Sequence, residues 1–214
     1  MLKNLKNMCQ TIFGKKKIIQ YSPPRTGSTL VYNILRELFS HCKIQKTHNY
    51  EDKFDAYPVV VTYRHPLDSI ASSIQRYGRT PSDEEIRAQI REFDKTGIGD
   101  ILKIRNQSNV LMLKYEEFYN RYDYIYDLLE KFFSIKIPAD QRKRLSDGYN
   151  MDAVKQMTQN FDDFRGYNKV TQLHGRHISE HKGETYYYKS YFSPAQIEYL
   201  KNVYKDILDA FDYK

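Results

Sequence analysis

The sequence predicts an α/β fold of three layers, in which helices cover both faces of a mostly parallel sheet and a helical part follows at the C-terminus. Two observations predict this class. Short apolar, β-branched runs alternate with amphipathic helical segments, which is typical of parallel strands buried on both faces. One of these strands leads into a loop of Arg, Gly, Ser and Thr that opens a helix, as phosphate-binding loops do. We expect the 214 residues to form a single domain.

The elements are expected in the following order. Strands are predicted at 15–22, 43–47, 57–63 and 109–115. Helices are predicted at 28–39, 66–77, 117–133 and 194–211, the last of them packing back on the sheet. The first helix has apolar residues at 30, 31, 34, 35 and 38, which is helical spacing. Two further Ser-x-x-Glu/Gln patterns, at Ser82–Glu85 and Ser193–Gln196, predict capping boxes that open helices.

Composition narrows the class of protein. The chain has 34 Lys and Arg against 27 Asp and Glu, a net charge of +7, which suggests an anionic partner such as a nucleotide, a nucleic acid or a membrane surface. Aromatic residues make up 14% of the chain, which argues against disorder despite a mean hydropathy of −0.75. No run approaches the roughly 18 apolar residues of a membrane helix, and the N-terminus lacks the features of a signal peptide.

Cysteine usage points to a reducing compartment. Cys9 and Cys42 are the chain's two cysteines, too few for a disulfide framework or a four-cysteine zinc site. We expect both to be reduced thiols and the protein to be cytoplasmic.

The most informative stretch is Tyr21–Thr29, which follows the first predicted strand and opens the first helix. Exposed N–H groups and the positive end of the helix make such a turn an anion site. Gly27 allows close approach of the backbone, and Arg25 adds a planar bidentate donor suited to phosphate or sulfate. Ser28 and Thr29 add hydroxyl donors. The other interpretation is an ordinary strand–turn–helix with Ser and Thr as caps.

This loop differs from that of nucleotide triphosphatases and kinases. Their pattern needs Gly-Lys before Ser or Thr, and here Ser28 stands before Thr29. The strand at 57–63 is followed by Arg64 and not by an Asp that would hold Mg²⁺. A metal-dependent phosphotransferase is therefore disfavoured but stays the first alternative.

The stretch Ser22–Leu30 (SPPRTGSTL) resembles the 5′-phosphosulfate loop of sulfotransferases that use 3′-phosphoadenosine 5′-phosphosulfate (PAPS). Carbohydrate-type members are most similar, since Arg25 stands where cytosolic members have Lys. Because Arg is effectively always protonated, Arg25 is expected to stabilise charge and not to donate a proton. Leu30 stands where cytosolic members often have a Trp against the adenine, so another residue must cover that face of the base.

A second segment, Tyr63–Ser72, extends the resemblance. Arg64 ends a predicted strand and Ser72 lies eight residues later in the next helix. This spacing can bring both side chains to the carboxyl edge of the sheet, where open α/β sheets bind ligands. In the family, an Arg and a Ser at this spacing hold the 3′-phosphate of the cofactor. Without the resemblance, Arg64 is equally a surface ion-pair residue.

A third segment, Gln45–His48, supplies a candidate base. A histidine at the end of a predicted strand, with an ordinary pKa of about 6.5, suits removal of a hydroxyl proton. The Lys-Thr-His run resembles the catalytic segment of cytosolic sulfotransferases, which implies that His48 is the base and that Lys46 neutralises developing charge. If the chain follows carbohydrate-type members more closely, a carboxylate is the base, with Glu51 and Asp52 the nearest candidates.

Two further segments resemble the family's nucleotide site. Tyr115, in the run Lys114–Glu117, matches the tyrosine near the adenine. His181, Lys182 and Gly183 match the Arg-Lys-Gly segment that wraps the 3′-phosphate, with His181 in the place of Arg. A histidine there would make the phosphate contact dependent on pH.

The resemblance implies transfer of a sulfuryl group from PAPS to a hydroxyl or amine of a small-molecule or carbohydrate acceptor, leaving 3′-phosphoadenosine 5′-phosphate (PAP). It implies that His48 takes the proton, that Arg25, Lys46 and the amides of 26–29 stabilise charge, and that no metal is required. We expect no nucleic-acid partner, and the dimer segment of cytosolic members has no clear match before His181. The segment 77–109 is expected to border the acceptor cleft. The remaining alternatives are a non-catalytic module that binds an anionic polymer and an inactive protein of the same fold.

Overall fold

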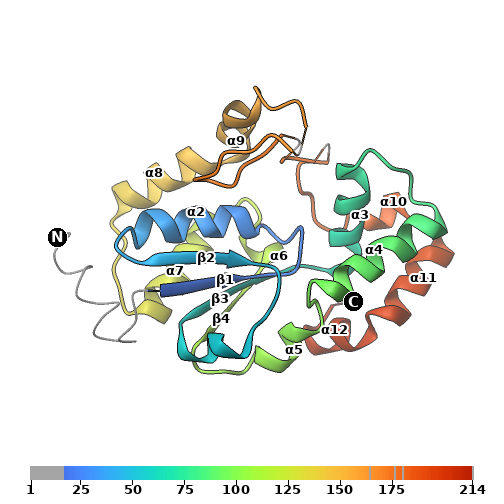
Figure 1. The fold of residues 1–214 in the computed structure, drawn as a ribbon, viewed down its shortest axis with the longest axis horizontal. Coiled ribbons are helices and arrows are strands. Elements are labelled where there is room, and N and C mark those ends of the chain that lie inside the picture. The colour runs from blue at the N-terminus through green and yellow to red at the C-terminus, as the bar shows by residue number, and fades with distance from the viewer. Residues whose placement is uncertain (1–16, 164, 176, 180, 214) are drawn as a thin grey trace.

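The computed structural model describes residues 17–163, 165–175, 177–179 and 181–213. Four parallel strands form the central sheet, in the order β2-β1-β3-β4 (Figure 1). They are β1 (Lys17–Tyr21), β2 (Lys43–Thr47), β3 (Val59–Tyr63) and β4 (Val110–Lys114). The four predicted strands and the α/β class are confirmed. Cys9 lies outside the described residues, and Cys42 is partly buried against the core that contains Ile18 and Val60.

The register brings the ends of three strands to one edge. Tyr21 of β1 pairs with Thr47 of β2 on one side and with Val61 of β3 on the other. The residues that follow these strands therefore leave the sheet side by side, at its carboxyl edge. This is the edge at which parallel α/β sheets bind ligands.

Alternate side chains of the strands enter two separate cores. Ile18 and Val60 are fully buried on the face that α2 and α7 cover, and Ile19, Val59 and Val61 are fully buried on the face that meets α3 and α4. Because successive strand residues point to opposite faces, a continuous apolar strand requires cover on both. The three-layer arrangement follows from this.

The helical elements have the following bounds. Before β4 they are α2 (Ser28–Leu38), the 3₁₀ helix η1 (Asp52–Ala56), α3 (Pro66–Arg76), α4 (Asp83–Lys95) and α5 (Asp100–Ile104). After β4 they are α6 (Tyr115–Phe118), α7 (Tyr122–Phe133), α8 (Ala139–Tyr149), α9 (Met151–Thr158), α10 (Tyr188–Tyr191), α11 (Pro194–Val203) and α12 (Lys205–Ala210). None of the helices in the described ranges combines the length and apolarity that a membrane span needs.

The two longest predicted helices are each divided. The segment 117–133 is split into α6 and α7, because Asn120 has a φ of 56°, in the left-handed region that a right-handed helix cannot continue through. The segment 194–211 is split at Tyr204, whose backbone leaves the helical region. Tyr204 and Leu208 are nonetheless buried in the core with Val59, so this part packs against the sheet core as predicted.

The predicted caps are found at both helices. Ser82 Oγ accepts from the N–H of Glu85 at 3.2 Å, whereas the Glu85 carboxylate binds Arg79, so the reciprocal half of the box is absent there. Ser193 and Gln196 form the complete capping box of α11. In Figure 1 the red C-terminal helices α10 and α11 lie beside the green α3, and this contact brings the C-terminal part of the chain to the carboxyl edge of the sheet.

Candidate functional site

The loop after β1 is fixed from within by its own side chains. Thr26 Oγ1 donates to the carbonyl of Pro23 at 2.9 Å and lies 2.8 Å from Thr62 Oγ1 of β3. Gly27 has a φ of 79°, and a Cβ there would lie 2.9 Å from the ring of Phe118. The loop therefore needs glycine at this position for backbone conformation and for space. Its free N–H groups precede α2, where the helix dipole favours an anion.

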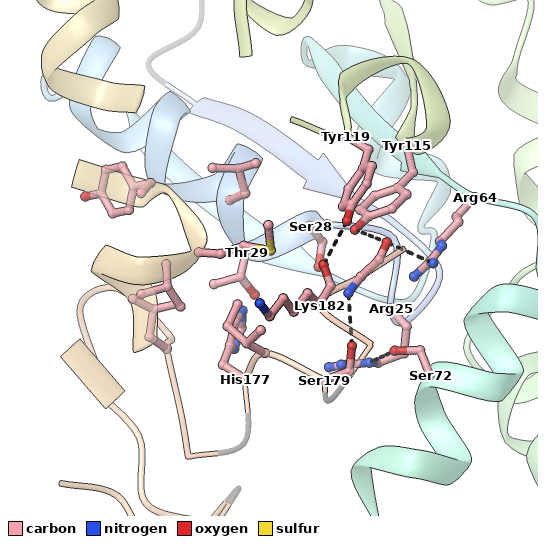
Figure 2. Close-up of a pocket in the computed structure, with 18 of the residues that line it drawn as sticks. Arg25, Ser28, Thr29, Arg64, Ser72, Tyr115, Tyr119, His177, Ser179 and Lys182 are labelled. Carbon is pink, nitrogen blue, oxygen red and sulfur yellow. Dashed lines mark hydrogen bonds between the residues drawn. The ribbon is translucent and has the colours of Figure 1, made fainter. Parts of the chain in front are cut away.

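A cavity of ≈310 Å³ opens against this loop, and Figure 2 shows residues of its lining. Two groups of residues form its polar part. We call residues 22–29 together with 46–48, Arg64 and α3 the sheet-edge wall. We call residues 173–175, 177–179 and 181–184 the C-terminal wall. The third side is largely apolar and comprises Leu30, Phe118, Tyr122, Tyr149, Met151 and Val154.

Most residues that the sequence singles out line this cavity together. They are Arg25, Gly27, Ser28, Thr29, Lys46, His48, Arg64, Ser72, Tyr115, Lys182 and Gly183. They come from β2, from the segments that follow β1, β2 and β3, from α2, α3 and α6, and from the C-terminal wall. The convergence of segments from residue 25 to residue 183 is the geometry that the resemblance implies.

Half-buried cations dominate the part of the sheet-edge wall around the loop. Arg25 Nε donates to Ser72 Oγ at 3.1 Å, a contact drawn in Figure 2. Burial, with the charges of Arg76 and Arg64, lowers the pKa of Arg25 to about 9. Lys46 Nζ donates to Thr29 Oγ1 at 2.8 Å, and burial with the charges of Arg76 and Arg25 lowers its pKa to about 8. Cations that depress one another's pKa in this way are stabilised by a bound anion.

His48 has a defined tautomer. Its Nδ1 lies 2.7 Å from the carbonyl oxygen of Ser22, which can only accept, so Nδ1 carries the hydrogen. The neutral ring therefore has its lone pair on Nε2. Burial, followed by the charges of Lys46 and Arg76, lowers the pKa of His48, and a hydrogen bond to Ser22 partly opposes the shift. His48 is thus neutral at physiological pH and can accept a proton.

Arg64 joins the two walls. Its Nη2 donates to the carbonyls of Gly183 at 3.2 Å and Glu184 at 2.6 Å, and its guanidinium lies 4.3 Å from the ring centroid of Tyr115. The Tyr115 hydroxyl also donates to the Gly183 carbonyl, at 2.9 Å. Arg64 Nε is buried and has no partner among the described atoms, so the guanidinium retains an unused donor.

Asp68, one turn after Arg64 on α3, holds the chain that follows the C-terminal wall. Its two carboxylate oxygens accept from the N–H groups of Tyr186 at 2.6 Å and Tyr188 at 3.0 Å. The same carboxylate lies 3.7 Å from Arg64 Nη2, and both side chains are almost fully buried. This carboxylate therefore positions both Arg64 and the backbone that Arg64 contacts.

Four predicted residues lie outside the lining. The Thr26 hydroxyl is used within the loop, so only its backbone N–H is left for a ligand. His181 stacks on Tyr187 with centroids 4.1 Å apart, and burial lowers its pKa to about 4, so it does not titrate near neutrality. Glu51 and Asp52, the alternative bases, stand at the start of η1, where Glu51 pairs with Lys53.

The segment 77–109 contributes no residue to this cavity, so the expectation that it borders the acceptor cleft stays a prediction. Its helix α4 packs against α3 through buried Ile86, Ile90 and Phe93. Gln89 on the same face accepts a hydrogen bond from Ser73 of α3 at 2.7 Å. The charged residues of α4 lie on its outer, solvated face.

Other cavity residues were not predicted. Arg76 stands one turn after Ser72 on the same face of α3, so helical spacing from Ser72 would have indicated it. His174 and His177 line the cavity from irregular backbone, and only their His-x-x-His spacing was visible in the sequence. Met151, at the start of α9, lies with Leu30 on the apolar side.

The donor set suits a nucleotide with two separate phosphate groups. Lys46 contacts Thr29 of the loop, and Arg64, with its unused Nε, contacts the Gly183 carbonyl of the C-terminal wall. Arg25, hydrogen-bonded to Ser72, interacts electrostatically with both Lys46 and Arg64. The apolar side has the chemistry to receive a base. Across the described ranges, no group of three or more His, Cys, Asp or Glu residues has the geometry of a metal site.

Comparison with solved structures identifies the fold. Mouse sulfotransferase SULT7A1 complexed with PAP matches with a TM-score of 0.68 at 15% sequence identity, over 97% of this chain and 89% of that one. Retinol dehydratase with retinol and PAP matches with a TM-score of 0.67 at 16% identity, over 97% and 85%. Retinol dehydratase with androsterone and the inactive cofactor PAP gives 0.64 at 14% identity, over 97% and 84%. No protein-family model and no curated protein sequence matches the chain. The chain therefore has the sulfotransferase fold.

Proposed function

We propose that this single-domain protein is a sulfotransferase that moves a sulfuryl group from PAPS to a hydroxyl or amine of a small-molecule or carbohydrate acceptor. The observation that carries the proposal is the convergence of Arg25, Lys46, Arg64, Ser72 and Lys182 on one cavity at the carboxyl edge of the sheet. The likeness to structures crystallised with PAP supports it independently of those residues.

Each part of the donor has a matching part of the cavity. The amides of 26–29, the hydroxyls of Ser28 and Thr29, and Arg25 and Lys46 would hold the 5′-phosphosulfate. Arg64, Ser72, Lys182 and Gly183 would hold the 3′-phosphate. PAPS supplies the activated sulfuryl group.

The apolar side of the cavity would receive the adenine. Leu30, Phe118 and Met151 all belong to the lining there. A thioether is flexible and polarisable and packs well on aromatic rings. We propose that Met151 covers the face of the base that Leu30, in the place of a Trp, leaves open.

The chain's own groups suit the proton and charge changes of the transfer. His48 Nε2 is a neutral acceptor in the cavity and would take the proton of the acceptor hydroxyl or amine. Arg25 and Lys46 would stabilise negative charge on the leaving phosphate. Glu51 and Asp52 are outside the lining, which favours His48 as the base.

The proposal also covers the class of acceptor, the cellular compartment and the need for metal or other partners. The retinol dehydratase structures hold retinol and androsterone, which supports a small-molecule acceptor for this chain. We propose that the enzyme works in the cytoplasm, needs no metal and has no nucleic-acid partner. A metal-dependent phosphotransferase is disfavoured, since Arg64 follows β3 where such enzymes need a metal-binding carboxylate.

Calorimetric titration tests the proposal, with PAP, ADP and ATP in EDTA and with ATP and Mg²⁺ in its absence. We expect binding of PAP without metal, with ADP and ATP at least about tenfold weaker because they lack the 3′-phosphate. Arg64→Ala should reduce the affinity for PAP to that for ADP. Arg87→Ala removes the same charge from an exposed site on α4 and serves as the matched control. A preference for ATP with Mg²⁺, or equal affinity for PAP and ADP, would refute the proposal.

A further inference from the structure

Two histidines of the C-terminal wall form a hydrogen-bonded pair. His174 Nδ1 lies 2.6 Å from the carbonyl oxygen of Gly175, and His174 Nε2 lies 3.1 Å from His177 Nδ1. Both rings line the cavity that also contains His48. The proposed function assigns no role to either of them.

The hydrogen bonds determine where the hydrogens of the neutral pair are. The Gly175 carbonyl can only accept, so His174 Nδ1 carries a hydrogen and its Nε2 is an acceptor. His177 Nδ1 must then donate to that Nε2, and the lone pair of His177 is left on its own Nε2. His177 therefore has the same tautomer as His48, with hydrogen on Nδ1 and a basic Nε2. At His48 the acceptor for Nδ1–H is the Ser22 carbonyl, and at His177 it is Nε2 of His174.

The surroundings keep this pair neutral. The charged groups that act on His177 are Arg25 of the loop, Lys46 of β2 and Arg76 of α3, and all of them are cationic. Burial, and then these neighbours together with His174, lowers the pKa of His177 well below its ordinary value. A proton on His177 is therefore unfavourable until a negative group enters the cavity. A neutral imidazole with a free Nε2 accepts hydrogen bonds and does not donate them to an anion.

We infer that His177 is a second proton acceptor of the cavity, held in its reactive tautomer by His174, which acts as a positioning residue. This inference deepens the proposed function and rests on it. With water as the acceptor, a bond forms between the water oxygen and the sulfur of PAPS while the bond from sulfur to the phosphate oxygen breaks. PAP leaves with the electron pair of that bond, and the water proton goes to Nε2 of His177 or of His48.

The test measures slow release of PAP from PAPS with water as the only acceptor. The proteins compared are the wild type, His48→Gln, His177→Gln and the double variant. General bases typically contribute about 100-fold or more, so we expect the double variant to lose that much and each single variant to lie between it and the wild type. The inference is overturned if His177→Gln releases PAP as fast as the wild type, or if the wild type is no faster than the double variant.

His174 is tested by a matched pair of substitutions in the His48→Gln background. His174→Gln can place a side-chain oxygen where Nε2 accepts from His177, so we expect the rate to be retained. His174→Leu has no acceptor and should lower the rate to that of the His48→Gln/His177→Gln variant. Nitrogen-15 NMR of labelled histidine should show His177 with hydrogen on Nδ1 in the wild type and a tautomer mixture in His174→Leu; a hydrogen on Nε2 of wild-type His177 contradicts the pair.

Measuring PAP binding distinguishes a failure of the proposed function from a failure of the role inferred for His177. Every variant should bind PAP within about threefold of the wild type, which shows that it is folded and that the donor site is intact. If the wild type itself does not bind PAP, the proposed function fails. If PAP binds and the rates do not follow the pattern above, the proposed function stands and the role of His177 is wrong.

Discussion

The two polar walls of the cavity are stabilised in different ways. The sheet-edge wall is formed by residues at the ends of strands and helices of the packed sheet. A hydrogen bond between Thr26 and Thr62 holds its loop against β3. The described part of the C-terminal wall consists of turns and irregular backbone, tied to the first wall by Arg64 and Tyr115 through the Gly183 carbonyl. Core packing therefore determines the geometry of the sheet-edge wall, and a few hydrogen bonds determine that of the C-terminal wall. We therefore expect substitutions in the first wall to change both stability and binding, and those in the second to change mainly binding.

Removing the Asp68 carboxylate, which connects the two walls, should cause the largest loss in the free energy of unfolding. Asp68→Ala removes the acceptors of two backbone N–H groups and leaves Arg64 without its buried counter-charge. Loss of one partner of a buried pair typically lowers the free energy of unfolding by about 3–5 kcal/mol. Urea unfolding measures the change. Asp68→Asn, which keeps the shape and one strong acceptor, should lose less; an Ala variant as stable as the wild type would show that Asp68 does not join the walls.

A pair of glycines compares the walls directly. Both Gly27 and Gly183 have positive φ, 79° and 75°. An L residue in this region costs about 1–2 kcal/mol, and at Gly27 the added Cβ also meets Phe118 within packed structure. Gly27→Ala should lower both thermal stability and PAP affinity. At Gly183 the added Cβ meets the hydroxyl end of the Tyr115 side chain and the edge of the Tyr119 ring, in a turn of the C-terminal wall. Gly183→Ala should therefore lower PAP affinity with a smaller change in melting temperature. Equal losses of stability would remove the distinction.

PAP binding should be coupled to proton uptake by Lys46 of the sheet-edge wall. Lys46 has a pKa of about 8 in the free protein, and a bound phosphate favours its protonated form. PAP affinity should therefore fall by up to about thirtyfold as pH rises from 7 to 9.5, the limit for one proton with a pKa of about 8 in the free protein. Calorimetry near pH 8.5, in buffers of different ionisation enthalpy, should show proton uptake on binding. Lys46→Met should abolish most of it, while uptake unchanged in that variant would assign the protons to another group.

The smallest effect is expected far from both walls. Ser193→Ala removes the capping box of α11 and should lower the free energy of unfolding by about 1 kcal/mol, measured by urea denaturation. PAP affinity should not change, because α11 contributes no residue to the cavity lining. Ser190→Ala, at an exposed serine of α10 whose hydroxyl donates to the Tyr187 carbonyl, is the control for loss of one side-chain hydrogen bond outside the cap. A change in PAP affinity for Ser193→Ala alone would show that the cap supports the C-terminal wall.

Local sequence patterns locate the sheet-edge wall more directly than the C-terminal wall, for one physical reason. Arg25, His48 and Arg64 each directly follow or lie close to the end of a strand of the sheet, and parallel strands bring such positions together. The apolar periodicity that defines the strands therefore also locates the site. The fold class and all four strands were predictable for the same reason, whereas Asn120 and Tyr204, which divide two helices, interrupt no apolar pattern.

The residues of the C-terminal wall carry no such periodic signal. His174 and His177 are placed by a hydrogen bond between them and by one to the Gly175 carbonyl, which depend on the path of irregular backbone. His181 was placed by resemblance alone, and the structure turns its ring onto Tyr187. Contacts that depend on long-range backbone position cannot be derived from local spacing.

The most direct test of the two-wall site is hydrogen–deuterium exchange with and without ligand. If one nucleotide binds both walls, PAP should slow exchange in peptides covering 22–30 and in peptides covering 181–187. ADP, which lacks the 3′-phosphate, should protect 22–30 and leave 181–187 close to the free protein. Protection of neither segment by PAP, or identical protection of both by PAP and ADP, would contradict a 3′-phosphate site built by Arg64 and the C-terminal wall.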